Sequence, residues 1–234
     1  MNKTGKTSAI LLAGGLGTRM QSAVAKQFLP LGDKPVALHS FSLFLEIPQI
    51  DELIVVCAEE YRPLFADFSK TSKKPMQFAE PGPRRQDSAY NGLLAASSES
   101  TLICIHDAAR PFINSTLVCQ LLEAAQQHGA AAPAIPLKFT IKERCSENMV
   151  IRTPDRTRFC EIQTPQAIKK EILLAGYRHV HAHGITATDD VQLAELAGYP
   201  VKLVDGSETN IKLTTPFDLL LATQFLEANG ALLL

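Results

Sequence analysis

The chain has no excess of charge of either sign, although it is rich in apolar residues. Its 23 lysine and arginine residues balance 24 aspartate and glutamate residues, which gives a formal net charge of -1 at pH 7, and 46% of its 234 residues are hydrophobic. A protein that wraps nucleic acid carries a basic surface, and a disordered acidic segment contains few apolar residues. The balance therefore excludes both classes and indicates a folded protein with no nucleic-acid partner.

The sequence also lacks the signals that place a chain in a membrane or outside the cell. No stretch approaches the ~18 apolar residues needed to span a bilayer, and the apolar run 9–13 is too short for a signal-peptide core. The cysteines at 57, 104, 119, 145 and 160 are never closely paired, which excludes a local CxxC redox site or zinc knuckle. Scattered thiols are typical of a reducing compartment, so we expect a cytoplasmic protein with no membrane partner.

Short apolar runs alternate with segments of helical periodicity along most of the chain. The runs of strand length are 8–13, 53–58, 76–80, 102–106, 130–136 and 201–205. The segments with apolar residues every three to four positions are 36–46, 59–68, 87–97, 116–128, 168–179, 189–197 and 216–229. This alternation predicts an α/β fold with a Rossmann-like, mostly parallel sheet flanked by helices, and we expect residues 1–234 to form a single domain.

The alternation breaks at residues 137–160, which are rich in charge. Polar and apolar residues alternate there in two short pieces around Ser146, a pattern typical of a β-hairpin. A hairpin that projects from an α/β core has little of its own chain to pack against, so we expect this arm to contact a second copy in a homodimer. The alternative is a flexible surface hairpin without a partner.

A glycine-rich loop, AGGLGTRM at 13–20, follows the first predicted strand and precedes Lys26. Glycines let the backbone approach a ligand and turn N–H groups toward an anion. The Walker pattern GxxxxGK[ST] is absent, and the dinucleotide pattern GxGxxG fails at Met20. Arg19 and Lys26 instead suit a nucleoside triphosphate, because two cations stabilise the charge that develops when its α-phosphate is attacked.

Four more short motifs follow the glycine loop. They are RQDS at 85–88, HDAARP at 106–111, TPQ at 164–166 and NIKLT at 210–214. In this order, from about residue 8 to 226, the set resembles the 2-C-methyl-D-erythritol 4-phosphate cytidylyltransferases of the non-mevalonate isoprenoid pathway. The resemblance implies transfer of the cytidylyl group of CTP to the polyol phosphate with release of pyrophosphate, Mg²⁺ as the cofactor, and a homodimer formed through the arm.

The resemblance also implies a role for each matched residue. The catalytic residues would be Arg19, Lys26, Arg156 and Lys212. The nucleotide-binding residues would be Ala13, Gly14, Gly15, Gly17, Gly82, Arg85, Ser88 and Asp107, and the substrate-binding residues would be Arg110, Thr140, Thr164 and Thr188. Asp107 would also hold the metal, since Mg²⁺ takes one or two carboxylates plus substrate phosphates. By the same resemblance, Thr140 and Arg156 would serve the active site of the neighbouring subunit.

Two positions depart from the family pattern, and three other functions stay open. Gly14 stands where the family usually has a second alanine, and Phe139 stands where it commonly has an acidic residue. One alternative is a ribitol-5-phosphate cytidylyltransferase, which would share the glycine loop and the HDAARP turn. A second is a nucleotide-binding module without turnover, and a third is a nicotinamide dehydrogenase, which would need an acidic residue where the second strand ends at Cys57 and Ala58.

Overall fold

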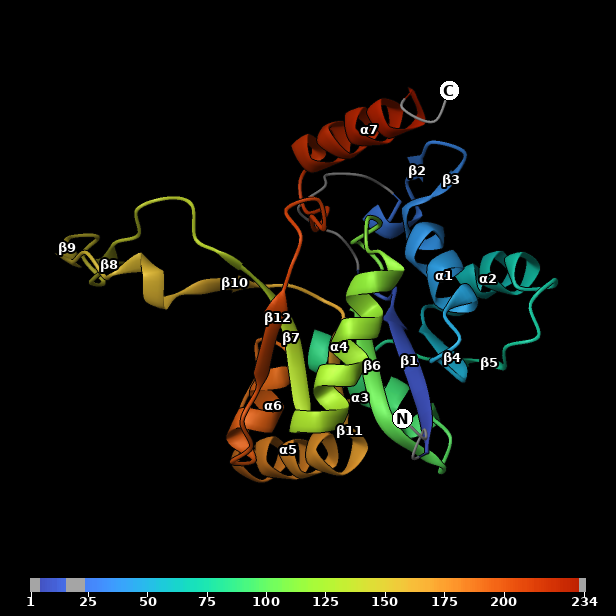
Figure 1. Cartoon of the computed structure of the whole chain (residues 1–234), viewed down its shortest axis with the longest axis horizontal. Coiled ribbons are helices and arrows are strands. Elements are labelled where there is room, and N and C mark those ends of the chain that lie inside the picture. The colour runs from blue at the N-terminus through green and yellow to red at the C-terminus, as the bar shows by residue number, and fades with distance from the viewer. Residues whose placement is uncertain (1–4, 16–23, 232–234) are drawn as a thin grey trace.

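The structure, a computed structural model, describes residues 5–15 and 24–231. Within them, eight strands form one central sheet (Figure 1). In spatial order the strands are β10 (Cys160–Ile162), β7 (Ala130–Pro136), β11 (Gln166–Lys169), β6 (Ser100–Asp107), β1 (Lys6–Leu12), β4 (Glu52–Val56) and β5 (Met76–Ala79), and β12 (Lys202–Asp205) pairs with β7. The sheet matches the predicted fold class.

The pairing is parallel at one side of the sheet and mixed at the other. Strand β1 runs parallel to β4 and β6, and β4 runs parallel to β5. Strand β11 runs antiparallel between β6 and β7, while β12 is parallel to β7. The prediction of a helix from residue 168 was wrong at its start, because Ile168 and Lys169 belong to β11. The apolar periodicity of β11 continues into the helix that follows it, so the sequence does not show where the strand ends. The strand is recognised only by its pairing with β6.

Seven α-helices and three one-turn 3₁₀ helices surround the sheet in the described residues. They are η2 (Lys26–Phe28), α1 (Val36–Glu46), η3 (Glu59–Tyr61), α2 (Arg62–Phe68), α3 (Arg85–Ala95), α4 (Ser115–His128), η4 (Arg156–Arg158), α5 (Lys170–His183), α6 (Val191–Leu196) and α7 (Pro216–Ala231). Among these residues no helix combines the length and the apolar character needed to cross a membrane.

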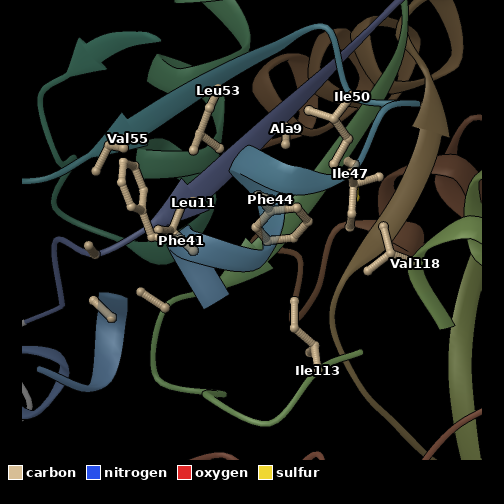
Figure 2. Packing of buried hydrophobic residues seen from close by; sticks show 14 of the residues in the cluster. Ala9, Leu11, Phe41, Phe44, Ile47, Ile50, Leu53, Val55, Ile113 and Val118 are labelled. Carbon is tan, nitrogen blue, oxygen red and sulfur yellow. The ribbon is translucent and has the colours of Figure 1, made fainter. Parts of the chain in front are cut away.

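Two apolar cores lie on the opposite faces of the sheet, because successive residues of a strand point to opposite sides. Leu11 of β1 packs with α1, α2 and α4, where Phe41 and Phe44 are fully buried (Figure 2). Its neighbour Ile10 packs on the other face with α3, α5 and α6. Burial on both faces explains why the central strands read as continuous apolar runs rather than as alternating ones.

The segment 137–160 forms the predicted hairpin and extends away from the sheet (Figure 1). Strands β8 (Glu143–Arg144) and β9 (Val150–Arg152) pair antiparallel. Asn148 takes the left-handed conformation in the turn, with φ of 63°. The arm exposes large apolar side chains, among them Phe139, of which 81% is accessible to solvent.

A smaller hairpin lies near α7. It consists of β2 (Pro30–Leu31) and β3 (Lys34–Pro35), and its Leu31 packs with Leu213 and Ala222 in a third, smaller apolar cluster. This cluster joins the C-terminal helix to the segment that follows the glycine loop. The loop that carries Lys212 is thereby attached to the core just before α7 begins.

Candidate active site

A cavity of about 510 Å³ lies at the carboxyl ends of β1 and β6, on the side of the sheet that faces α7 (Figure 1). Its wall comes from five separate segments of the chain. The lining residues include Gly14, Gly15, Lys26, Gly82, Arg85, Ser88, Asp107 and Lys212. Parallel strands place their carboxyl ends at one edge, which is where open α/β sheets bind ligands. Motifs more than 190 residues apart in sequence thus share one cavity.

The glycine loop is held in place by Gln27, a residue that sequence reasoning missed. The Gln27 side-chain amide donates hydrogen bonds to the carbonyl oxygens of Ala13 at 2.7 Å and of Gly15 at 2.8 Å. Gln27 is buried, and both it and the preceding Lys26 line the cavity. Its position next to Lys26 was the available signal. Two of the predicted site residues, Gly17 and Arg19, lie outside the described residues.

Two glycines allow the loops of the cavity wall to pack closely against each other. A Cβ atom built on Gly14 would lie 2.3 Å from the Cβ atom of Pro81, and one built on Gly82 would lie 2.4 Å from the Cβ atom of Asp87. Nothing lies within 4 Å of a Cβ atom built on Gly15. The departure at Gly14 therefore has a local cause, since Pro81 fills the space that an alanine would need.

Ser88 fixes the loop that precedes α3. Its hydroxyl accepts a hydrogen bond from the Gly82 backbone N–H at 2.9 Å, and the residue is buried. This bond closes a turn over residues 82–88 and points the loop toward the cavity. The hydroxyl thus bonds to the backbone of its own loop.

Asp107 is the carboxylate of the cavity, and two cations hold it. Arg85 donates from Nε to Oδ1 at 2.9 Å, and Lys212 donates from Nζ to Oδ2 at 2.6 Å. Burial alone would raise the pKa of Asp107, but Arg85 and Lys212 lower it below its usual range. The carboxylate is therefore ionised at neutral pH and can act as a hard oxygen ligand.

Arg85 bridges Asp107 to a second carboxylate that lies deeper in the protein. Its two terminal nitrogens donate to the oxygens of Asp190 at 3.0 and 2.7 Å. Asp190 is only 1% exposed, and burial raises its pKa against the opposing attraction of Arg85. The two carboxylates in turn raise the pKa of Arg85, although burial opposes its charge. Sequence reasoning missed Asp190, because no spacing rule connects positions 85 and 190.

A hydrogen-bonded chain fixes the turn that carries Asp107. The Asp107 N–H donates to the hydroxyl of Thr164, that hydroxyl donates to Nδ1 of His106, and Nε2 of His106 donates to the Arg110 carbonyl, each at 3.1 Å. Because a carbonyl can only accept, this chain assigns the proton of the neutral ring to Nε2. Burial lowers the pKa of His106 to about 4, so the ring is uncharged at neutral pH.

The same region ties the Lys212 loop to the sheet. Arg110 donates from Nη1 to the Asn210 carbonyl at 2.7 Å, and the Asn210 side chain donates to the Thr164 carbonyl at 2.9 Å. Arg110, Thr164 and Asn210 thus connect the turns after β6 and before α7. Asn210, like Gln27 and Asp190, is a residue whose role the sequence did not indicate, although it begins the NIKLT motif.

Six of the predicted site residues that the structure describes do not line the cavity: Ala13, Arg110, Thr140, Arg156, Thr164 and Thr188. Three of them are exposed side chains outside it. Thr140 and Arg156 are exposed on the arm, where Arg156 donates to the Lys138 carbonyl at 2.6 Å. Thr188 is exposed near α6 and bonds to the Gln192 side chain at 3.1 Å. A single chain therefore gathers Gly14, Gly15, Gly82, Arg85, Ser88 and Asp107 around one cavity, and it leaves Thr140, Arg156 and Thr188 outside that cavity.

The donor set of the cavity suits a metal that arrives with its substrate. Within residues 5–15 and 24–231 no group of three or more histidine, cysteine, aspartate or glutamate side chains forms a metal cage. Of the described residues that line the cavity, Asp107 is the one with a carboxylate, and Mg²⁺ is commonly bound by one or two carboxylates together with substrate phosphates. The residues present thus fit a divalent cation bound to a nucleotide.

Comparison with known proteins identifies the family. The model of the 2-C-methyl-D-erythritol 4-phosphate cytidylyltransferase (IspD) family matches residues 7–228. The chain belongs to this family. The chloroplastic enzyme of that name from rice is 43% identical over 96% of this chain and 75% of its own length. The enzyme of that name from Chlamydia pneumoniae is 42% identical over 94% of this chain and 99% of its own.

Solved structures agree with this family assignment. A 4-diphosphocytidyl-2C-methyl-D-erythritol synthase from Anaerococcus prevotii superposes with a TM-score of 0.85 at 29% identity, over 96% of this chain and 100% of that one. A 2-C-methyl-D-erythritol 4-phosphate cytidylyltransferase from Thermus thermophilus superposes with a TM-score of 0.78 at 33% identity, over 94% and 98%. The protein is thus an enzyme of the cytidylyltransferase class, and nucleotidyltransferases generally need a divalent cation.

Proposed function

We propose that this cytidylyltransferase joins CTP and 2-C-methyl-D-erythritol 4-phosphate, giving 4-diphosphocytidyl-2-C-methyl-D-erythritol and pyrophosphate for isoprenoid precursor biosynthesis. The observation that carries the proposal is the cavity in which the glycine loop, Lys26, Asp107 and Lys212 meet. Membership of the family supports the identity of both substrates. The free thiols of all five cysteines support a cytoplasmic location.

In this reaction a phosphate oxygen of the acceptor attacks the α-phosphorus of CTP, and pyrophosphate leaves in line. The protein contributes positioning and charge stabilisation rather than covalent chemistry. Lys26 and Arg19 stabilise the charge that develops on the α-phosphate, and backbone N–H groups of residues 13–17 cradle the triphosphate. Gly82 and Ser88 border the base, with Arg85 beside them.

Asp107 would hold Mg²⁺, which when bound neutralises part of the triphosphate charge. The side chain of Asp107 already lies at the cavity and is ionised, and its two present partners are both basic. Lys212, whose side chain is 36% exposed, then serves the acceptor phosphate together with Arg110, Thr164 and Thr188. Thr164 is buried and its hydroxyl accepts a hydrogen bond from the Asp107 N–H, so we propose that it also orients the turn that carries Asp107.

We further propose that residues 1–234 act as one domain and that the arm at 137–160 forms a homodimer. The exposed apolar side chains of Phe139, Met149 and Ile151 support this, because a hairpin with such a surface is stabilised by a partner. Thr140 and Arg156 would then complete the acceptor site of the neighbouring subunit. The arm extends away from the sheet (Figure 1), and none of its residues lines the cavity formed by the described residues of the same chain, which agrees with that arrangement.

The direct test measures pyrophosphate release from CTP, Mg²⁺ and methylerythritol phosphate. We expect Lys26→Ala to lower kcat by at least about 100-fold, since it removes a charge that stabilises the transition state. Lys70→Ala is the matched control, because Lys70 is exposed and forms an ion pair with Asp67 just after the end of α2. The same assay with ribitol 5-phosphate decides the acceptor. Faster turnover of ribitol 5-phosphate than of methylerythritol phosphate would contradict the proposal.

A mixing experiment tests the shared site. Lys26→Ala and Arg156→Ala subunits, each inactive as homodimers, should regain activity in mixed dimers, because one of the two sites then has both intact residues. Lys142→Ala on the same arm is the control for Arg156→Ala, since Lys142 donates a hydrogen bond to Thr153 of the arm itself. If verified mixed dimers stay inactive, the arm does not serve the neighbouring site.

A further inference from the structure

Asp190 has no place in the reaction as described so far, yet it is the most buried charged group beside the cavity. It begins α6, far in sequence from the glycine loop, and only 1% of it is exposed. A buried carboxylate is costly unless it is paired and hydrogen-bonded. Asp190 forms an ion pair with Arg85, and Arg85 also bonds to Asp107. Asp107 is the proposed ligand of the cation that accompanies the nucleotide.

We propose that Asp190 is a positioning residue that holds Arg85 in place, so that Asp107 is free to bind the divalent cation of the nucleotide. This inference rests on the proposed function, in which a cation–nucleotide complex enters the cavity. Asp190 itself touches neither reacting group, and it acts through the guanidinium of Arg85.

The geometry of Arg85 divides its hydrogen bonds unequally. Two N–H groups, from Nη1 and Nη2, go to the two oxygens of Asp190, whereas only Nε bonds to Asp107. The planar guanidinium matches a carboxylate best in this paired arrangement. Asp190 therefore takes the paired side of Arg85, and Arg85 makes only one hydrogen bond to Asp107 in the described residues, beside the separate ion pair of Asp107 with Lys212.

Asp190 is itself held by the core rather than by the cavity. The side-chain oxygen of Gln166 accepts hydrogen bonds from the backbone N–H groups of Asp190 and Val191, each at 2.9 Å. Gln166 lies in β11, which pairs with β6, the strand that ends at Asp107. The paired strands β6 and β11 thus fix the positions of the Asp107 and Asp190 carboxylates, and Arg85 lies between the two.

Loss of the Asp190 charge would change the partner of Arg85. Among the described residues, Asp107 would then be the one carboxylate bonded to the Arg85 guanidinium. The two terminal nitrogens of Arg85, released from Asp190, would be able to turn toward Asp107. A cation would then have to displace a stronger ion pair, so its affinity for the CTP-bound enzyme would fall. The protein could stay folded, because Asn at position 190 keeps the size of the side chain.

The experiment measures Mn²⁺ binding to the full-length protein with CTP and without the acceptor, followed by electron paramagnetic resonance of free Mn²⁺. Mn²⁺ is used because it takes the same oxygen ligands as Mg²⁺. For Asp190→Asn we expect the apparent Kd for Mn²⁺ to rise by at least about tenfold, given the energies of buried ion pairs. The Mg²⁺ concentration that half-activates pyrophosphate release should rise in parallel, with kcat partly recovered at saturating Mg²⁺.

Asp189→Asn is the matched control. Asp189 is the neighbouring carboxylate, bonded to Gln166 and to the backbone of Gln192 but not to Arg85. Its replacement removes the same charge from nearly the same place, so any general electrostatic effect appears in both variants. We expect its apparent Kd for Mn²⁺ to stay within about threefold of the wild-type value, because Asp189 is partly exposed and solvent screens such charges.

Two results would overturn the inference. One is a folded Asp190→Asn protein whose Kd for Mn²⁺ is unchanged, even if kcat falls. The other is an equal rise in Asp189→Asn. Should circular dichroism show that Asp190→Asn does not fold, Asp190→Glu provides the second measurement. Its displaced carboxylate should also raise the Kd, and an unchanged value counts against the proposal.

The outcome is separable from the proposed function. If the Mn²⁺ measurements follow the expectation but the wild-type protein does not release pyrophosphate with methylerythritol phosphate, the proposed acceptor is wrong and the role of Asp190 stands. If pyrophosphate is released normally while the Kd values do not differ, the function stands and the positioning role is refuted.

Discussion

Replacement of Gly14 by alanine is the sharpest test of how the cavity wall is built. The added Cβ atom would lie 2.3 Å from Cβ and 3.1 Å from Cγ of Pro81. Carbon atoms in contact sit ~3.5 to 4.0 Å apart, so one of the two loops must move by more than ~1 Å. Both belong to the wall of the cavity, and the second continues into Gly82. The substitution should therefore affect stability and nucleotide binding together.

The magnitude follows from the cost of overpacking. An extra methyl group in a well-packed place costs ~1 to 3 kcal/mol, and we expect Gly14→Ala to lower the free energy of unfolding by that amount. Gly15→Ala is the internal control, because its Cβ atom would meet nothing within 4 Å. It should change stability by no more than ~0.5 kcal/mol. Urea unfolding followed by circular dichroism measures both values, and equilibrium binding of CTP measures the effect on the cavity.

Substitutions at Pro81 identify the clashing atom. Pro81→Gly removes the Cβ atom, so Gly14→Ala should cost little in that background, whereas Pro81→Ala keeps the Cβ atom and should not relieve the clash. Because a Pro→Gly change also loosens the unfolded chain, the coupling is taken from the double-mutant cycle. If Gly14→Ala is no more destabilising than Gly15→Ala, or if the cycle shows no coupling, the close packing of the two loops does not explain Gly14.

Two further predictions concern stability. His106 has a pKa of about 4 in the folded protein against an ordinary value of 6.5. The unfolded chain therefore binds a proton that the folded one does not, and the free energy of unfolding should fall between pH 6.5 and about 4 by up to ~3 kcal/mol. His106→Asn should lack this part of the fall in urea titrations at each pH, and an unaltered pH profile would contradict a neutral buried ring. Asn114→Ala should cost ~1 kcal/mol, because the Asn114 side chain caps α4 through the Leu117 N–H at 2.8 Å. Thermal unfolding measures this loss of stability. The kcat of Asn114→Ala should be unchanged, since neither Asn114 nor Leu117 lines the cavity.

Local sequence patterns were enough to predict the elements whose structure depends on residues adjacent in sequence. The continuous apolar runs of β1 and β4 predicted buried strands, and the charged break at 137–160 predicted the hairpin. The same reasoning failed at β11, whose four residues carry no strand pattern of their own. They become a strand because they fit between β6 and β7, and such a contact is invisible to local periodicity.

The candidate site divides in the same way. The glycine loop and HDAARP each carry their chemistry within a few adjacent residues, so the sequence alone indicated a phosphate-binding cavity with a carboxylate. The links between these motifs required the tertiary structure. Gln27 reaches back to the glycine loop, and Gly14 has to be glycine because Pro81 lies against it.

The even balance of charges is the clearest case of what each level determined. The sequence by itself established a near-neutral folded chain with the cations and carboxylates that the chemistry needs. Only the tertiary structure decided their pairing: Arg85 lies between Asp107 and Asp190, and Lys212 completes the group. The physical reason is that Coulomb interactions and hydrogen bonds depend on distance in space, and the sheet brings together residues that lie 105 positions apart in the chain.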